Sequence, residues 1–343
     1  MKFMVGYQLT ETNRFRDLLV SHSDSISEIY FPWSDMPNGR NPFTVNELYQ
    51  PWEAQQRLIE DLEIFSRAGL GLNLLLNGNC YGQYSLSKYL FQTVGDIVDY
   101  IGSRFAPPSV TTTSPLIARF IHQNFEGLEV RASVNMDIGT TQGMDYVADV
   151  FDGFYLQREF NRNEERIVRN LEWCRARGKK LYLLANSGCL NDCSAHVFHD
   201  NLVAHENEIR KVDNAVTFKG VCWDYLKNPE KWVSLIRDES YVRPEDIALY
   251  DDWFPVVKLA TRTNALPERI VHAYLSGRHA GNTLDLLEPN HSGVLYPYIL
   301  DNQRFPADFA KTVLRCDKRC DRCGYCASVL EQVLVNAEEY CAQ

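Results

Sequence analysis

The sequence of 343 residues contains little that would place it in a membrane or on nucleic acid. No apolar run approaches the roughly 18–20 residues that a bilayer-spanning helix needs, so no membrane span is expected. The opening MKFMVGYQLTETNRF soon turns polar and lacks the long apolar segment of a secretory signal, which predicts a cytoplasmic location. The net charge of −10 disfavours binding to a phosphate backbone. We therefore expect a small-molecule or peptide substrate rather than RNA.

Two sequence motifs are also missing, one that indicates a zinc peptidase and one that indicates a nucleotide-binding sheet. The sequence has no H-E-x-x-H run, which excludes the common zinc peptidase helix. No glycine-rich phosphate loop follows the first apolar segment, which disfavours an open, doubly wound sheet, the main alternative to the fold proposed next.

Alternating strand and helix patterns fill the first three-quarters of the chain. Helical periodicity occurs, for example, at 52–69, 163–178 and 266–277. Apolar runs that predict strands lie at 2–8, 26–33, 70–77, 109–114, 128–135, 151–157, 179–186 and 254–262. Apolar strands separated by helices pair in parallel, and eight such units predict an α/β fold, a closed (β/α)8 TIM-type barrel over residues 1–279.

The alternation ends after residue 277. Residues 276–306 are rich in turn residues and are expected to be loop-like, whereas 327–340 has the pattern of an amphipathic helix. We predict that 280–343 is a cysteine-rich tail packed on the barrel rather than an independent domain.

Four of the 10 cysteines lie within eleven residues of this tail. In a large chain from a reducing compartment, clustered thiols indicate metal binding rather than disulfides. The spacing C-x3-C-x2-C-x2-C favours a [4Fe–4S] cluster, with zinc as the alternative. The predicted ligands are Cys316, Cys320, Cys323 and Cys326.

A second cysteine group follows the seventh predicted strand, where loops form the mouth of a barrel. Cys189 and Cys193 are four residues apart, Cys222 is a plausible third ligand, and Cys80 follows another strand at the same rim. The group could hold a second [4Fe–4S] cluster, with three thiolates and an open iron site as the other possibility. Cys174, inside a predicted helix, is interpreted as a buried apolar residue.

Three further residues are candidates for catalysis. His199 lies in the loop after the seventh strand, close to His196. Lys258 and Arg262 have even spacing along the last strand, so both could point into the barrel and bind an anionic substrate. The alternative for this pair is a buried ion pair with Glu159 or Asp152.

A peptidase mechanism has its own candidate pair in the same loop. Cys193 and His196 are near enough in sequence to form a thiol–imidazole pair, although metal ligation would remove the nucleophilicity of the thiol.

Several segments together resemble the collagenase-like peptidase family U-32 over roughly residues 70–280. They are SVTTTSPLIARFI, EVRASVNM, FDGFYLQREFNRN, LLANSGCLNDCSAHVFHDN and VVKLATR followed by VHAYLSG. The family typically carries a Lys-Ile-Glu-Gly-Arg run at the late strand. Here the run is Lys258-Leu-Ala-Thr-Arg262, so Ala260 stands where the family has a glutamate. The resemblance implies a TIM-type barrel with a [4Fe–4S] cluster on barrel-loop cysteines, which Cys189 and Cys193 match and Cys222 matches more loosely.

The resemblance also implies a function. Some related proteins act in oxygen-independent hydroxylation, so we expect an iron–sulfur protein that supports such a hydroxylation or a related redox reaction. The tail cysteines are not carried over from the family; from their spacing we expect a second cluster there that could pass electrons to the first. A collagenase-like peptidase and a non-catalytic iron–sulfur partner subunit are the alternatives. A heterodimer with a related protein, or an electron donor as partner, is compatible with each of these.

Overall fold

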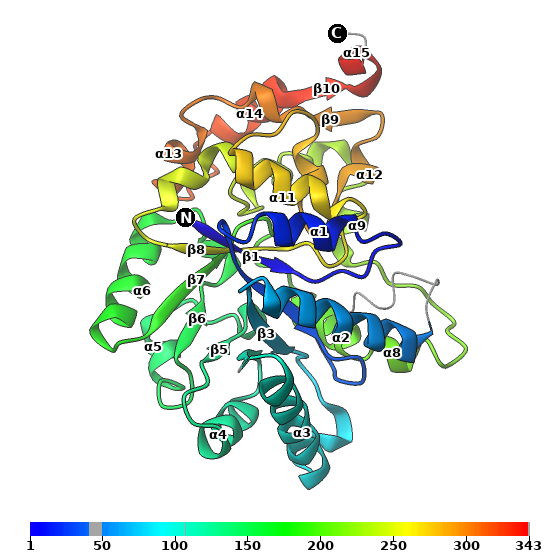
Figure 1. The fold of residues 1–343 in the computed structure, drawn as a ribbon. Coiled ribbons are helices and arrows are strands. Elements are labelled where there is room, and N and C mark those ends of the chain that lie inside the picture. The colour runs from blue at the N-terminus through cyan, green and yellow to red at the C-terminus, as the bar shows by residue number, and fades with distance from the viewer. Residues whose placement is uncertain (41–49, 107, 342–343) are drawn as a thin grey trace.

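The computed structural model describes residues 1–40, 50–106 and 108–341. Eight parallel strands form a closed barrel in sequence order, and β1 pairs with β8 to complete the ring (Figure 1). This closure confirms the predicted barrel and excludes the open sheet. The strands are β1 (Lys2–Gly6), β2 (Ile26–Pro32), β3 (Gly71–Leu76), β4 (Ser109–Thr112), β5 (Val130–Ala132), β6 (Gly153–Tyr155), β7 (Lys180–Leu184) and β8 (Val256–Leu259).

Helices cover the outside of the barrel, as the sequence periodicity predicts. The predicted helices at 52–69, 163–178 and 266–277 correspond to α2 (Pro51–Arg67), α6 (Glu164–Ala176) and α11 (Pro267–Ser276). The other helices along the barrel strands are α1 (Arg14–Ser21), α3 (Lys88–Arg104), α4 (Pro115–Asn124) and α5 (Thr141–Asp145). Their apolar faces and the strands form the main core, in which Cys174 is fully buried, as expected.

Polar side chains occupy part of the barrel interior. Arg131 on β5 donates two hydrogen bonds to Glu28 on β2, at 2.7 and 2.9 Å, and also pairs with Glu129. Tyr30 and Tyr155 lie above this ion cluster, toward the carboxyl ends of the strands, and pack with Met4, Leu75, Val134 and Tyr182. The interior is therefore filled, and only its mouth is open to a ligand.

The long connection between β7 and β8 contains four short helices. They are α7 (His196–Ala204), α8 (Glu206–Ile209), α9 (Val221–Tyr225) and α10 (Ser234–Arg237). The tail packs against the second half of this connection, since Leu226, Leu235 and Ile236 share a buried apolar cluster with tail residues such as Leu300 and Val333.

The tail has more regular structure than the sequence suggested. Residues 276–306 are not simply a loop, because they contain α12 (Ser292–Leu295), β9 (Tyr298–Leu300) and two 3-10 turns. The helix expected at 327–340 is also wrong in part: α14 (Tyr325–Val333) ends where β10 (Leu334–Asn336) pairs antiparallel with β9, and α15 (Ala337–Cys341) follows. The β-branched Val333 and Val335 favour the end of the helix and the start of a strand, because such residues prefer extended backbone. Pairing with β9 then gives β10 a partner. α13 (Phe309–Leu314) precedes the clustered cysteines.

Within the described residues, no helix combines the length and the hydropathy needed to cross a membrane.

Candidate functional site

The barrel mouth holds a small cavity of about 60 Å³ at the carboxyl ends of the strands. Lys258 and Arg262, both predicted to point inward, line it and are buried. Lys258 Nζ lies 4.0 Å from the ring centre of Tyr30 and 4.7 Å from that of Tyr155. Burial and the neighbouring Arg262 lower the pKa of Lys258 to about 7. The two cations therefore share one desolvated space.

Neither cation forms the ion pair considered from the sequence. Asp152 Oδ2 instead accepts a hydrogen bond from the Val130 amide at 2.9 Å, away from the mouth. Glu159 has a buried carboxylate oxygen, Oε2, that accepts no hydrogen bond from the described residues, and it forms no ion pair with Lys258 or Arg262. Arg262 donates to the Arg40 carbonyl at 2.5 Å, so it is held by backbone rather than by a carboxylate.

Two further arginines line the same cavity and were not identified from the sequence. Arg40 follows β2, and Arg158 follows β6 in a short 3-10 turn. Arg158 donates to Asn135 Oδ1 at 2.9 Å and lies 3.5 Å from Cys189 Sγ. The sequence signal was the position of Arg158 directly after a strand, which in a barrel indicates the mouth.

The two predicted histidines on α7 have different surroundings. His196 Nδ1 is 3.1 Å from Asp137 and its Nε2 is 3.4 Å from Asp200. The hydrogen bond to Asp137 raises the pKa of His196, so this ring is held by carboxylates rather than paired with Cys193. Burial and the positive charge of Arg40 lower the pKa of His199, which packs on Phe218.

Cys222, on α9, contacts a histidine that the sequence analysis missed. Cys222 Sγ is 3.4 Å from His291 Nε2, and His291 Nδ1 is 3.1 Å from Glu239 Oε1. The side chains of His291 and Glu239 are both 0% exposed, whereas Cys222 is partly exposed. Burial raises the pKa of Glu239. Thiol, imidazole and carboxylate thus stand in the order of a nucleophile, its base and the group that orients the base.

A cavity of about 390 Å³ lies beside this triad. Trp223, which follows Cys222, contributes to its wall and packs edge-on against His291, with ring centres 5.2 Å apart. Asn290 and Ser292, the neighbours of His291, line it as well. Glu288 borders both this cavity and the cationic one at the mouth. The two spaces are therefore neighbours along one wall.

Cys80 belongs to a second, more exposed constellation. It is hydrogen-bonded to His205 and to the Gly82 amide, and these contacts lower the pKa of the thiol. His205 Nδ1 in turn lies 2.6 Å from Glu208, whose side chain is 70% exposed. Solvent screening weakens such a surface pair, so the imidazole beside Cys80 is less firmly oriented than His291 is.

Three of the tail cysteines, Cys316, Cys320 and Cys326, lie near enough to influence one another electrostatically. Burial raises the pKa of Cys326, and the neighbouring Cys316 and Cys320 add to that effect. The Lys318 amide donates to Cys316 Sγ at 3.3 Å, and Lys318 adopts the left-handed conformation, with φ of 60°. Cys320 and Cys323 are exposed. A backbone amide aimed at sulfur is a contact that stabilises a thiolate ligand.

Among the residues with a described placement, no three histidine, cysteine or acidic side chains converge closely enough to hold a metal ion. Cys189 contacts Arg158 and Cys222 contacts His291, so these two barrel-loop thiols have different partners. The nine cysteines with described side chains are free thiols. Metal binding by either cysteine group therefore stays a prediction.

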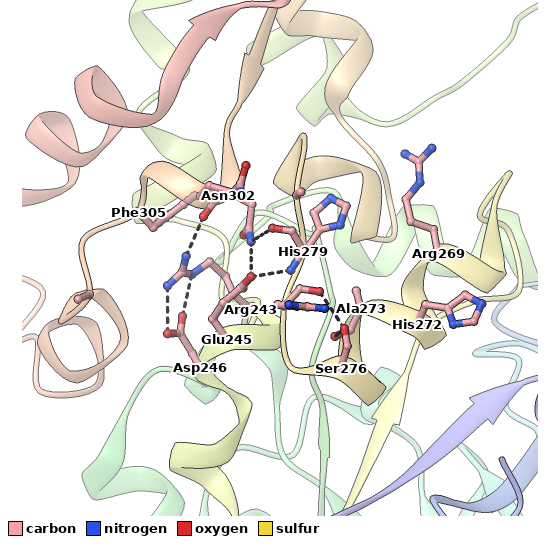
Figure 2. Close-up of a pocket in the computed structure, with 14 residues that line it drawn as sticks. Arg243, Glu245, Asp246, Arg269, His272, Ala273, Ser276, His279, Asn302 and Phe305 are labelled. Atoms are coloured by element: carbon pink, nitrogen blue, oxygen red, sulfur yellow. Dashed lines mark hydrogen bonds and ion pairs between the residues drawn. The ribbon is translucent and has the colours of Figure 1, made fainter. Parts of the chain in front are cut away.

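A cavity of about 830 Å³ lies at the seam between barrel and tail and is larger than the one at the mouth (Figure 2). Several of its polar side chains are paired with one another rather than directed at a ligand. Arg243 forms a two-pronged pair with Asp246, at 2.7 and 3.0 Å. Glu245 accepts hydrogen bonds from the His279 amide and from Asn302, as Figure 2 shows. Because these polar groups already satisfy one another, we assign this seam to docking of the tail.

Comparison with known proteins finds a curated relative and a solved structure of similar fold. No family model matches the sequence. The Methanocaldococcus jannaschii protein named "Uncharacterized protease MJ1657" is 24% identical over 300 residues, which cover 84% of this chain and 83% of that protein. The solved structure of the U32 peptidase Mk0906 aligns with a TM-score of 0.52 at 16% identity, covering 76% of this chain and 92% of that one. These matches support the relationship to the U32 peptidases, and the solved structure has the same fold.

Proposed function

We propose that this chain is a thiol-dependent hydrolase of peptide bonds in which Cys222 is the nucleophile. The observation that carries the proposal is the contact of Cys222 Sγ with His291 Nε2 at 3.4 Å, together with that of His291 Nδ1 with the buried Glu239 at 3.1 Å. The name of the M. jannaschii relative, a protease, agrees with this chemistry.

The triad can perform acyl transfer in two steps. His291 takes the thiol proton while Cys222 Sγ attacks the carbonyl carbon, and the C–N bond breaks as the imidazolium returns the proton to the leaving amine. Water, deprotonated by His291, then attacks the thioester, releases a carboxylic acid and regenerates the thiol. Glu239, 3.1 Å from His291 Nδ1, holds the ring in one orientation through both steps.

A peptide assay on matched variants tests the assignment. We place Cys222→Ala in a Cys80→Ser background, so that the Cys80 thiol cannot contribute, and use a quenched fluorescent peptide library as substrate. Turnover should fall about 10³-fold or more, because loss of one triad member removes the whole nucleophilic route. Cys323→Ser, a substitution at an exposed tail thiol, serves as the control and should retain activity. Full activity in Cys222→Ala contradicts the proposal.

A labelling experiment examines the same contact without any substrate. Iodoacetamide should alkylate Cys222 faster than Cys323, and the difference should disappear in His291→Gln, which removes the base. Peptide mass spectrometry follows both sites in one sample, and Cys323 is the internal reference. Equal rates at Cys222 in the wild type and in His291→Gln would show that His291 does not activate the thiol.

A second candidate function is the iron–sulfur redox enzyme expected from the sequence, performing an oxygen-independent hydroxylation or a related reaction. The hydrogen bond from the Lys318 amide to Cys316 Sγ and the proximity of Cys316 and Cys320 to Cys326 support a metal group there. Its proposed ligands are Cys316, Cys320, Cys323 and Cys326. Such a cluster would supply electron transfer when bound. Cys189, Cys193, Cys222 and Cys80 are the proposed ligands of a barrel-loop cluster, and His199 with Lys258 and Arg262 would face the substrate.

Metal analysis after anaerobic purification separates the two candidates. The redox proposal requires iron and sulfide in the wild type and their loss in Cys320→Ser or Cys189→Ser, while zinc alone would exclude it. Loss of iron in Cys222→Ser would identify Cys222 as a ligand and overturn the thiol hydrolase. A metal-free protein that cleaves peptides would overturn the redox enzyme.

A further inference from the structure

The geometry of the barrel mouth points to a second recognition element, and we propose that its cavity binds a small oxyanion, a carboxylate or phosphate group, between Lys258, Arg262 and Arg158. This site is separate from the cysteine triad, so the two proposals can fail independently.

The charges around the cavity are unbalanced. Arg40, Arg158, Lys258 and Arg262 line it, against the two carboxylates of Asp200 and Glu288. The other buried arginines with carboxylate partners show what a balanced site looks like: Arg131 pairs with Glu28, and Arg243 with Asp246. Within the described chain, none of the four mouth cations has such a partner within 4 Å.

The two carboxylates of the cavity are committed to other donors. Glu288 Oε1 accepts from the Thr263 amide at 2.6 Å and from the Thr263 hydroxyl. Asp200 Oδ2 accepts from Asn79 at 3.3 Å and lies 3.4 Å from His196. Glu288 and Asp200 therefore reduce the positive potential of the cavity from a distance. Neither accepts a hydrogen bond from Lys258 or Arg262 among the described contacts.

Lys258 is the group that most requires a partner. It is only 6% exposed, and its ammonium contacts the faces of two tyrosine rings, with no hydrogen bond to Nζ among the described residues. A buried ammonium without an acceptor is costly, and an entering oxyanion would remove that cost. Arg262 and Arg158 carry planar forks that suit a two-oxygen group.

The size of the cavity limits what enters. About 60 Å³ accommodates a single carboxylate or phosphate group rather than a whole substrate. Because Glu288 borders both spaces, the rest of a bound molecule would extend toward the cavity beside Trp223. The site therefore recognises one charged end of a longer ligand.

Binding of simple anions to the intact protein tests this inference. Titration calorimetry with inorganic phosphate and with acetate, at constant ionic strength in chloride, should show saturable binding of at least one of them. Lys258→Met and Arg262→Met should each weaken it tenfold or more. Lys227→Met, which removes an exposed lysine charge, should leave it unchanged. The stronger of the two anions identifies the group that the site prefers.

Unchanged affinity in both mouth variants, or the absence of saturable binding by either anion, would overturn the inference. If the variants fail to fold, a protection experiment on the wild-type protein tests the same site. Reductive methylation of Lys258, followed by peptide mass spectrometry, should slow when the binding anion is present, and an equal rate would contradict the site. Cys222→Ala should bind the anion normally, which separates this result from any failure of the hydrolase proposal.

Discussion

At the residue scale, the buried ammonium of Lys258 makes stability depend on pH. Burial and Arg262 lower its pKa to about 7 from 10.5, with Glu28, Arg131 and Glu288 as the other charges that act on it. Below pH 7 both folded and unfolded chains carry the charge, and the folded state bears the full burial cost. Between about pH 7 and 10.5 only the unfolded chain is protonated, so the cost is progressively relieved as pH rises.

Urea denaturation of the wild type and Lys258→Met at pH 6.5, 8 and 9.5 measures this dependence. The free energy of unfolding of the wild type, relative to the variant, should increase with pH by up to about 3–5 kcal/mol over the whole window. Lys227→Met, at an exposed position, should show a constant difference from the wild type. A constant difference for Lys258→Met as well would mean that the lysine keeps its ordinary pKa.

Gly220 controls the position of the triad thiol. Its φ of 111° favours glycine, and a Cβ there would lie 3.3 Å from Cys222 Sγ and 3.5 Å from the ring of His199. Gly220→Ala should cost about 1–3 kcal/mol of stability and change the alkylation rate of Cys222, because the sulfur must move. Gly178→Ala is the matched control, since Gly178 also has a positive φ but open space around it. Equal alkylation of Cys222 in both variants would count against the contact.

At the scale of elements, the tail helix α14 stabilises the segment that carries Glu239. Val333 at its end is fully buried in the cluster that contains Leu235 and Ile236. Val333→Ala should lower the free energy of unfolding by about 1–3 kcal/mol through the lost methyl groups and the cavity left behind. Val216→Ala, at a position that is 81% exposed, should change it by less than about 0.5 kcal/mol. Chemical denaturation compares the two variants, and similar small losses would argue against tight docking of α14.

The elements of the barrel were predictable because each strand has a local apolar signature of its own. The tail was harder, because the strand identity of β10 depends on pairing with β9, more than thirty residues away in sequence. A short apolar run at a helix end does not reveal such a partner. For that reason the expected single helix at 327–340 proved to be a helix, a strand and a second helix.

The candidate site divides in the same way. Lys258 lies on β8, Arg262 directly follows that strand and Cys189 follows β7, so the barrel topology brings all three to the mouth. His291 and Glu239 belong to no recognisable motif. His291 lies 69 residues after Cys222 and 52 residues after Glu239, and it contacts both only once the tail has folded back. Neither periodicity nor spacing encodes a contact of that kind.

At the scale of the whole molecule, the second apolar cluster joins the tail to the connection between β7 and β8. A fragment of residues 1–279 should therefore expose Leu226, Leu235 and Ile236, bind the dye ANS and lose cooperative unfolding, whereas the full chain should unfold in one transition. Calorimetry and dye fluorescence on the two proteins measure this. A fragment that unfolds cooperatively would show that 280–343 is dispensable for the barrel.

The wall formed by Glu288 has a consequence for any substrate that occupies both cavities it borders. A molecule anchored by its charged end on one side would present its reacting bond on the other at a constant offset. The distance between the two cavities would then fix the cleavage position. The cleavage products would share a single spacing between the anionic group and the newly formed terminus.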